Sequence, residues 1–358
     1  MNNIYKHKHI KTVIIEKEYY NGKNIPVKLS EEGITVNIET LSKIKNISKN
    51  DYEIKTLKEY YQDFLKPLNK FEDCDIELIL GKNKSLKYLE YIKENISDIS
   101  RLITDYHISY FKHRKETYNN LNSVKLDDLI LDIPQYNHAS VTGRTSIIKG
   151  FNFLTMKKED RKRLKYTDKK YTLLEMDFKS CEPFFYIKTN LDIDNKIEDV
   201  YEYIAKLINY KIKDRPSFKR GIISLMYGAT NKSITRLSGI KDSDITKIKQ
   251  VLKIEETKEF LEKEFQEKEV FFNYYGRPIL KGNNVVNYWI QSSAVDFCSF
   301  AFGDFIKNND VKPCFLIHDS ITFAVLNEDV KKYLNLSYLK CPISKIEIPV
   351  KVEKLNDS

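Results

Sequence analysis

The stretch CFLIHDSITFAV, residues 314–325, places a histidine and an aspartate between two runs of apolar and β-branched residues. Runs of this kind predict a strand, a tight turn and a second strand, with Asp319 at the bend. A carboxylate in such surroundings is costly unless a positive group meets it. The pattern therefore indicates a cation near Asp319 and raises the question of a second carboxylate in a similar place.

That second carboxylate lies in TLLEMDF, residues 172–178, where Asp177 closes another predicted buried strand. Two aspartates side by side would repel each other. Mg²⁺ resolves the repulsion because it binds one or two carboxylates together with phosphate oxygens. Two such ions about 3.5–4 Å apart stabilise the attacking and the leaving oxygens of an in-line phosphoryl transfer. Aspartates that only cap a turn are the alternative for either motif alone.

A third stretch, DRPSFKRGIISLMYGAT at residues 214–230, predicts a helix with two cations on one face. Arg215 and Lys219 are four residues apart, and Tyr227 follows two turns later near the same stripe. Two cations followed by an aromatic ring suit a triphosphate followed by a base. A surface helix with solvated Arg and Lys is the alternative.

Composition is compatible with a protein that binds a polyanion. The 358 residues allow two or three subdomains, and 60 Lys and Arg against 51 Asp and Glu give a net charge of +9. The five cysteines form no C-x-x-C pair, so neither a disulfide framework nor a zinc site is predicted. Without a signal peptide or a long apolar run, we expect a cytoplasmic protein of a bacterial or phage-infected cell, away from membranes.

The motifs, in their order along the chain, resemble those of the family A (polymerase I-like) DNA polymerases. The six matching stretches are EEGITVNIETL at 31–41 (the start of the thumb), TGR at 142–144 (a primer-side loop), DFKSCE at 177–182 (motif A), R-x3-K-x7-Y-G at 215–228 (motif B), N-x3-Q at 287–291, and IHD at 317–319 (motif C). The resemblance spans most of the chain, and the order of the motifs makes it specific.

The resemblance implies an α+β protein with the right-hand polymerase fold, which has an antiparallel-sheet palm and helical fingers and thumb. The expected parts are a short strand or N-terminal arm at 1–25, a thumb-like helical region at 26–135, a palm at 136–182 and 277–358, and fingers at 183–276. The clearest predicted helix, residues 80–115, falls in the thumb. Because the thumb-like segment begins so early, we expect no proofreading exonuclease domain.

The resemblance also implies roles at the reacting centre. Asp177 and Asp319 would bind two Mg²⁺ ions, for which Mn²⁺ can substitute. Lys219 and Arg215 would hold the incoming triphosphate, and Lys219 would also protonate the leaving pyrophosphate, a role that suits an ammonium group with a tunable pKa.

Further roles follow for residues around that centre. Tyr227 would lie by the template base, Ile223 would contribute to the nucleotide site, and Glu182 would be the steric gate that excludes a ribose 2′-OH. The residues expected to contact primer and template are Thr142, Arg144, Asn287, Gln291 and His318. Such groups read minor-groove acceptors, which are nearly independent of sequence.

Some details resemble instead the single-subunit, phage-type RNA polymerases, which share the palm. Two stretches carry this second resemblance, KRGIISLMYG at 219–228 and IHDS at 317–320. The first has Ile223 and Ser224 on the predicted helix, and the second has Ser320 after Asp319. Glu182, together with TGR and N-x3-Q, favours DNA. The prediction is therefore a DNA polymerase that adds dNTPs to a primer 3′ end. A primase-like or RNA-synthesising polymerase is the alternative.

Two other function classes were weighed. A catalytically inactive module that only binds nucleic acid would be expected to lack Asp177, Asp319 or Lys219, and all three are present. A two-metal nuclease would have no use for R-x3-K-x7-Y-G. The expected partners are primer-template DNA and dNTPs, and the expected state is a monomer. Accessory replication proteins are compatible with so small a polymerase, although no residue points to one.

Two smaller features complete the expectations. The basic stretch KKEDRKRLKYTDKK, residues 157–170, has eight basic against three acidic residues, and its plain interpretation is a solvated surface loop. Cys181 lies inside motif A, and we interpret it as a small packing residue rather than a redox thiol.

Overall fold

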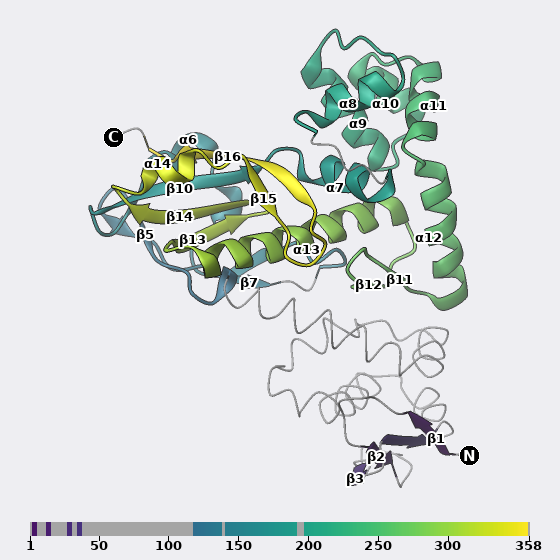
Figure 1. Cartoon of the computed structure of the whole chain (residues 1–358), viewed down its shortest axis with the longest axis horizontal. Coiled ribbons are helices and arrows are strands. Elements are labelled where there is room, and N and C mark those ends of the chain that lie inside the picture. The colour runs from purple at the N-terminus through teal and green to yellow at the C-terminus, as the bar shows by residue number, and fades with distance from the viewer. Residues whose placement is uncertain are drawn as a thin grey trace. The chain divides into compact units, whose positions relative to one another are not determined.

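The computed structural model in Figure 1 divides the chain into two compact units, residues 1–111 with 262–282, and residues 112–261 with 283–358. The structure describes residues 117–137, 140–191 and 197–356 in full, and only the backbone of four short strands before them. The helix predicted at 80–115, and with it most of the expected arm and thumb, lies outside the described residues.

The first unit contains a four-stranded sheet in the order β1-β4-β2-β3. Its strands are β1 Asn2–Tyr5, β2 Thr12–Ile15, β3 Val27–Ser30 and β4 Ile34–Asn37. A two-stranded hairpin also belongs to this unit, with β11 at Phe271–Phe272 and β12 at Pro278–Ile279. The short strand expected in the first 25 residues is confirmed as a backbone feature at β2.

The second unit is built on a five-stranded antiparallel sheet in the order β13-β14-β10-β16-β15 (Figure 1). Its strands are β10 Tyr171–Phe178, β13 Lys312–Ile317, β14 Ser320–Leu326, β15 Tyr338–Lys340 and β16 Glu347–Lys354. The structure confirms the strand–turn–strand around Asp319 and the strand that carries Asp177. In the register of the sheet, Asp177 lies opposite Ser320 on β14 and Lys351 on β16.

Helix α13, Val285–Asn308, packs its apolar side chains against one face of this sheet. The ring of Phe178 lies 5.2 Å from that of Phe297 and 5.0 Å from that of Phe302. Further along the helix, Phe305 lies 5.3 Å from Phe323 of β14. Because successive side chains of a strand point to opposite faces, Asp177 faces away from α13.

Small sheets cover part of the other face. Their strands are β5 Val124–Leu126, β6 Leu129–Ile130, β7 Gln135–Asn137, β8 Ser146–Lys149 and β9 Leu164–Tyr166, with a 3₁₀ turn at Phe153–Thr155. Leu164 and Phe153 are buried in a core with Leu173 of β10 and Phe315 of β13. The rings of Phe153 and Phe315 stack at 4.0 Å. On β10 the residue that joins this core is Leu173, which lies toward the end of the strand away from Asp177.

Residues 157–170, for which a solvated surface loop is the plain interpretation, are mostly exposed but contain regular structure in their middle. The segment forms the short helix α6, Lys158–Arg161, and strand β9. Leu164 is buried and pairs with Leu126, which fixes the strand. Arg161 forms an ion pair with Glu175 of β10, and both side chains are largely buried. The basic stretch is therefore anchored to the sheet by one apolar side chain and one ion pair.

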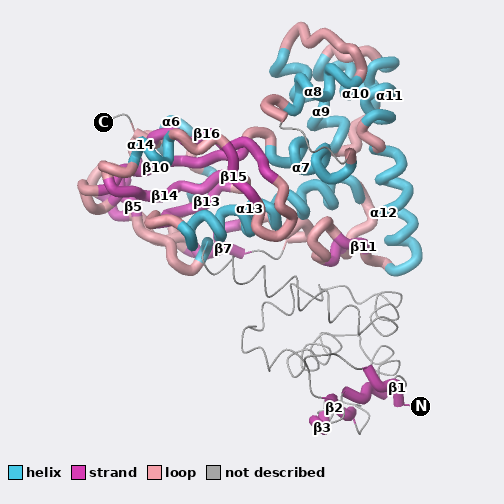
Figure 2. Tube along the Cα trace, in the orientation of Figure 1, coloured by secondary structure: helices cyan, strands magenta, loops and turns pink. Residues whose placement is uncertain are grey.

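The remaining helices are α7 Cys181–Asn190, α8 Val200–Leu207, α9 Arg215–Met226, α10 Asn231–Ser238, α11 Asp242–Val251, α12 Ile254–Lys268 and α14 Val330–Leu334. Five of them, α8 to α12, lie within the range 183–276 that was expected to form helical fingers. Figure 2 shows α8 to α11 gathered together, apart from the strands of the large sheet. Helices α8 and α9 begin at Asp199 and Asp214, whose carboxylates accept backbone N–H groups of the first turn.

Helices α9 and α10 pack closely because Gly221 faces α10. A Cβ atom at this position would lie 2.7 Å from Cβ of Ser238 and 2.8 Å from Cδ1 of Ile240. Among the described helices, none has both the length and the apolarity of a membrane span. At the level of antiparallel sheets with packed helices, the α+β prediction is confirmed; the division into palm, fingers and thumb stays a prediction.

Candidate active site

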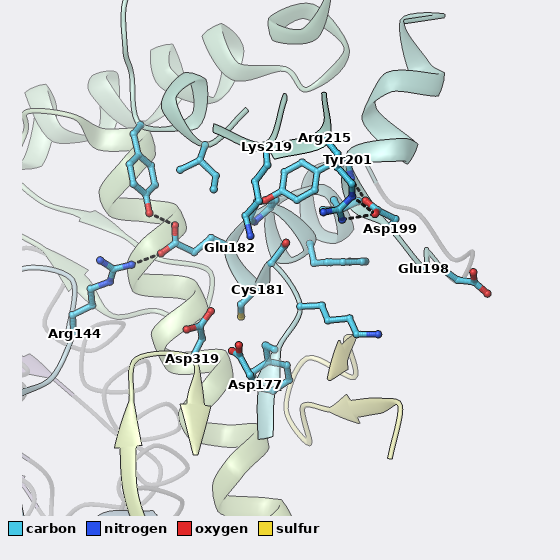
Figure 3. Close-up of a pocket in the computed structure, with 18 residues that line it drawn as sticks. Arg144, Asp177, Cys181, Glu182, Glu198, Asp199, Tyr201, Arg215, Lys219 and Asp319 are labelled. Carbon is cyan, nitrogen blue, oxygen red and sulfur yellow. Dashed lines mark hydrogen bonds and ion pairs between the residues drawn. The ribbon is translucent and has the colours of Figure 1, made fainter. Parts of the chain in front are cut away.

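Asp177 and Asp319 lie side by side at one end of the large sheet (Figure 3). Asp177 is the next-to-last residue of β10, and Asp319 lies at the bend between β13 and β14. The pairing of β10 with β14 brings them together, and the N–H of Phe178 donates to the carbonyl oxygen of Asp319 at 3.2 Å. The bend is tight enough that His318 adopts a left-handed backbone, with φ of 53°.

The surroundings of this pair disfavour negative charge on both carboxylates. Although Asp177 is exposed toward the pocket, desolvation of its carboxylate raises its pKa to about 7, and the nearby carboxylates of Asp319 and Glu175 add to the effect. Burial also raises the pKa of Asp319, against the opposing influence of its own backbone N–H and of His318. A divalent cation between the two carboxylates would reverse both shifts, because it favours the charged form.

This geometry predicts how the stability of the metal-free protein depends on pH. An unfolded Asp has a pKa of about 3.9, so the folded state binds the Asp177 proton more tightly than the unfolded state. This contribution to the free energy of unfolding is therefore lost as pH rises from about 4 to about 7. We expect the melting temperature in chelator to fall less steeply over this range in Asp177→Asn than in the wild type.

Thermal unfolding of both proteins at pH 4.5 and 7.5 measures the difference. Other titrating groups are common to the two chains and cancel. Added Mg²⁺ should raise the melting temperature of the wild type at pH 7.5 and have a much smaller effect on Asp177→Asn. Parallel pH profiles for the two proteins would contradict the raised pKa of Asp177.

The two aspartates line a pocket of about 610 Å³. This volume is in the range of small-molecule sites, about 300–1,000 Å³. Figure 3 shows Lys219 and Arg215 on the other side of the pocket from Asp177 and Asp319. The pocket therefore presents two carboxylates to one end of a bound molecule and two cations to another.

Helix α9 supplies the cationic wall, as its sequence pattern predicts. Arg215, Lys219 and Ile223 recur every four residues and all line the pocket, and Tyr227 continues the stripe at the C-cap of the helix. Such spacing places side chains on one helical face. The predicted cationic face is thereby confirmed as a geometric feature.

Two residues that the sequence did not single out hold these cations. The guanidinium of Arg215 lies 5.5 Å from the ring centre of Tyr201, and the ammonium of Lys219 lies 5.8 Å from the same ring. Arg215 also forms an ion pair with Asp199, to which its Nε donates at 3.0 Å. The only sequence signal at this point is Asp199 as an N-cap before an apolar run; nothing distinguishes Tyr201 from a core residue.

Glu182 also lines the pocket and is hydrogen-bonded to two other residues that line it. Its carboxylate accepts from Nη2 of Arg144 at 2.6 Å and from the hydroxyl of Tyr227 at 2.5 Å (Figure 3). Burial, together with the Glu182 carboxylate, raises the pKa of Tyr227 to about 12, while a hydrogen bond from Gln291 acts in the opposite direction. The structure thus joins Arg144, Glu182, Tyr227 and Gln291, which the sequence placed in four separate motifs.

The other predicted contact residues lie outside the pocket lining. Thr142 is buried in the turn before Arg144, and His318 is exposed at the bend beside Asp319. Although the residue is exposed, partial desolvation of its ring lowers the pKa of His318, and the Arg144 charge lowers it further. Asn287 is half-buried on α13, one turn before Gln291. None of these placements tests a role in binding nucleic acid.

No protein-family model matches the sequence, and no curated protein is similar to it. Among solved structures, the fold is similar to the polymerase domain of Pol1 from M. smegmatis, determined in complex with DNA primer-template and dNTP. The sequence identity is 13% and the TM-score 0.48, and the match covers 87% of this chain and 65% of that one. The chain thus spans somewhat less than two thirds of that protein. A likeness this distant establishes no activity.

Proposed function

We propose that this protein is a template-directed DNA polymerase that adds dNTPs to a primer 3′ end. The observation that carries the proposal is the pair Asp177 and Asp319 across one pocket from Lys219 and Arg215. Nucleotidyl transfer needs carboxylates that hold divalent cations at the α-phosphate and positive side chains that bind the rest of the triphosphate. The pocket offers both.

The two carboxylates suit Mg²⁺ as the metal. Their oxygens are hard ligands, and their pKa values are raised chiefly because desolvation disfavours the charged form, which a bound cation would favour. The described residues contain no cluster of three or more metal-ligating side chains. That agrees with Mg²⁺, which takes its remaining ligands from water and substrate phosphates. When bound, Mg²⁺ would neutralise charge on the phosphates and favour deprotonation of the primer 3′-OH.

The side chains of α9 would bind the triphosphate and protonate the leaving group. Arg215 and Lys219 would bind the β- and γ-phosphates, and the ring of Tyr201 beneath both cations would orient them. The guanidinium of Arg215 would give up one of its contacts with Asp199 and bind a phosphate oxygen instead. Lys219 would give a proton to the leaving pyrophosphate.

The reaction would be an in-line displacement. The primer 3′-OH gives its proton to solvent, its oxygen forms a bond to the α-phosphorus, and the bond from that phosphorus to the bridging oxygen of the β-phosphate breaks. Pyrophosphate leaves with the proton from Lys219. No covalent enzyme intermediate is needed, because positioning and charge stabilisation carry such reactions.

The same proposal extends to the architecture. The large sheet would belong to the palm, proposed at residues 136–182 and 277–358. Helices α8 to α11 would belong to the fingers, proposed at residues 183–276. The thumb would come from residues 26–135. Primer-template DNA would lie against the Asp177 end of the sheet, where Arg144, Thr142, Asn287, Gln291 and His318 are the proposed contacts.

Extension of an end-labelled DNA primer on a DNA template, with Mg²⁺ and dNTPs, tests the proposal against its rivals. A polymerase lengthens the labelled strand. A two-metal nuclease would shorten it. A module that only binds nucleic acid would leave its length unchanged while shifting its mobility, and either of these last results would reject the proposal.

Glu182 is the residue on which sugar choice should depend. Its carboxylate is fixed from two sides by Arg144 and Tyr227, so it cannot swing away from a ribose 2′-OH. We expect Glu182→Ala to lower the preference for dNTPs over rNTPs by about 10²-fold, the size of discrimination that one steric or polar contact supplies.

The preference is measured as the ratio of kcat/KM for a dNTP and the matching rNTP. Glu198→Ala is the matched control, because Glu198 is an acidic residue that lines the same pocket. An unchanged ratio in Glu182→Ala would refute the gate. Efficient use of rNTPs by the wild type would instead favour the primase-like or RNA-synthesising alternative.

A further inference from the structure

Two thiols face each other where α7 packs on α13. Cys181 is the first residue of α7, Cys298 lies in the middle of α13, and their Sγ atoms are 3.6 Å apart. Both side chains are buried, at 1% and 4% exposure. The two helices are also joined by aromatic contacts, with the ring of Phe185 5.8 Å from that of Phe297. The pair is therefore held in place by the surrounding core.

The other described cysteines have different surroundings. The thiol of Cys314 donates to the carbonyl oxygen of Lys312 at 3.4 Å, within β13. Cys341 is buried near the end of β15. Cys181 differs from both because it lines the pocket (Figure 3). Cys181 is therefore the member of the pair that lies next to the pocket, and at 1% exposure its thiol is covered by its neighbours.

We propose that Cys181 and Cys298 are an oxidative modification site, at which a peroxide converts the two thiols into a disulfide that links α7 to α13. The Cys181 thiolate attacks one oxygen of the peroxide, the O–O bond breaks, and water leaves with the proton. Cys298 sulfur then displaces the hydroxyl from Cys181 sulfur, and a second water leaves. Overall, two thiols lose two electrons and two protons, and one hydrogen peroxide becomes two waters.

The geometry requires only a small movement. A disulfide has an S–S bond of about 2.05 Å, so the two sulfur atoms must approach by roughly 1.5 Å from their 3.6 Å separation. Burial raises the pKa of both thiols, which makes the reaction slower than at an exposed cysteine and faster as pH rises.

The link would act on the pocket through α7. Cys181 is followed by Glu182, and it is preceded by the left-handed Ser180, which joins the helix to the strand that carries Asp177. A displacement of about 1 Å in such a site can cost about 10²-fold in rate. This consequence rests on the proposed polymerase function, whereas the disulfide itself does not.

The first test is chemical. Native full-length protein is treated with hydrogen peroxide, its remaining thiols are alkylated, and the peptides are mapped without reduction. The proposal expects a peptide that joins Cys181 to Cys298 and disappears on reduction. The control Cys314→Ala should still form it, and Cys298→Ala should not. Recovery of both residues as alkylated thiols or as sulfinic acids would overturn the proposal.

The second test is functional. Oxidised wild type should extend a primer at least about 10-fold more slowly than reduced wild type, and a thiol reductant should restore the rate. Cys298→Ala should keep its rate through the same treatment. A cross-linked protein with an unchanged rate would overturn the inhibitory effect. If reduced wild type shows no extension at all, the polymerase proposal fails, while the peptide map still decides the disulfide.

Discussion

Replacing Asp177 or Asp319 with asparagine is expected to lower the rate of nucleotide addition by about 10³-fold or more, which corresponds to about 4 kcal/mol of transition-state stabilisation. Asparagine keeps the shape of aspartate but lacks the charge that holds a divalent cation. One side chain comes from β10 and the other from the bend between β13 and β14, and both line one pocket, so neither can stand in for the other. Primer-template binding should survive, because the proposed DNA contacts are made by other residues, namely Thr142, Arg144, Asn287, Gln291 and His318.

Single-turnover primer extension, paired with fluorescence anisotropy of a labelled primer-template, separates these two effects. Glu353→Gln is the matched control, since Glu353 is a half-buried acidic residue on the neighbouring strand β16, does not line the pocket, and pairs with Lys351. The control should extend primers at the wild-type rate. A near-normal rate in either aspartate variant would show that the two-metal assignment is wrong.

The second large effect is expected at Lys219. Lys219→Met removes a cation of the pocket together with the proposed proton donor, and general acid catalysis contributes about 10²–10⁴-fold. We therefore expect kcat/KM for dNTPs to fall by at least about 10²-fold. Lys219→Arg keeps the positive charge but cannot give up a proton at neutral pH, so it should restore much of KM while kcat stays low.

Steady-state kinetics with a single dNTP measures both parameters. Arg220→Met is the matched control, because Arg220 is an exposed cation next in sequence that does not line the pocket and donates to Ser217. If Arg220→Met lost as much activity as Lys219→Met, the effect would come from the net charge of α9 rather than from one ammonium group. Full recovery of kcat in Lys219→Arg would reject the role in proton transfer.

The elements that carry the site were predictable because their signals are local. Apolar runs that end at Asp177 and at the Asp319 bend predicted β10 and the β13–β14 hairpin. Asp214 as an N-cap and Pro216 in the first turn mark the start of α9. The cationic face of α9 then follows from its four-residue spacing.

Non-local features could not be predicted in this way. The placement of β16 beside β10 depends on pairing between segments far apart in sequence. Leu164 looked like an isolated apolar residue in a basic loop, yet its burial makes the strand β9. Tyr201 supports two cations only because α8 packs next to α9. In each case tertiary contacts decided the outcome, and no local pattern encodes them.

The residues of the candidate site were named from separate motifs, but their interactions were not. Glu182 bonds to Arg144, 38 residues earlier, and to Tyr227, 45 residues later. The Cys181–Cys298 contact spans 117 residues. Spacing along the chain gives no information on such distances. The predicted roles in binding DNA and the boundaries of thumb, palm and fingers stay predictions.

Template-directed addition is the central claim, and incorporation of a single nucleotide tests it most directly. Wild-type protein is mixed with a labelled primer-template, Mg²⁺ and one dNTP at a time, and the four reactions are quenched on a short time scale. We expect the nucleotide complementary to the template base to be added far faster than the other three, and we expect no addition by Asp177→Asn. Absence of addition, or equal addition of all four nucleotides, would contradict the central claim.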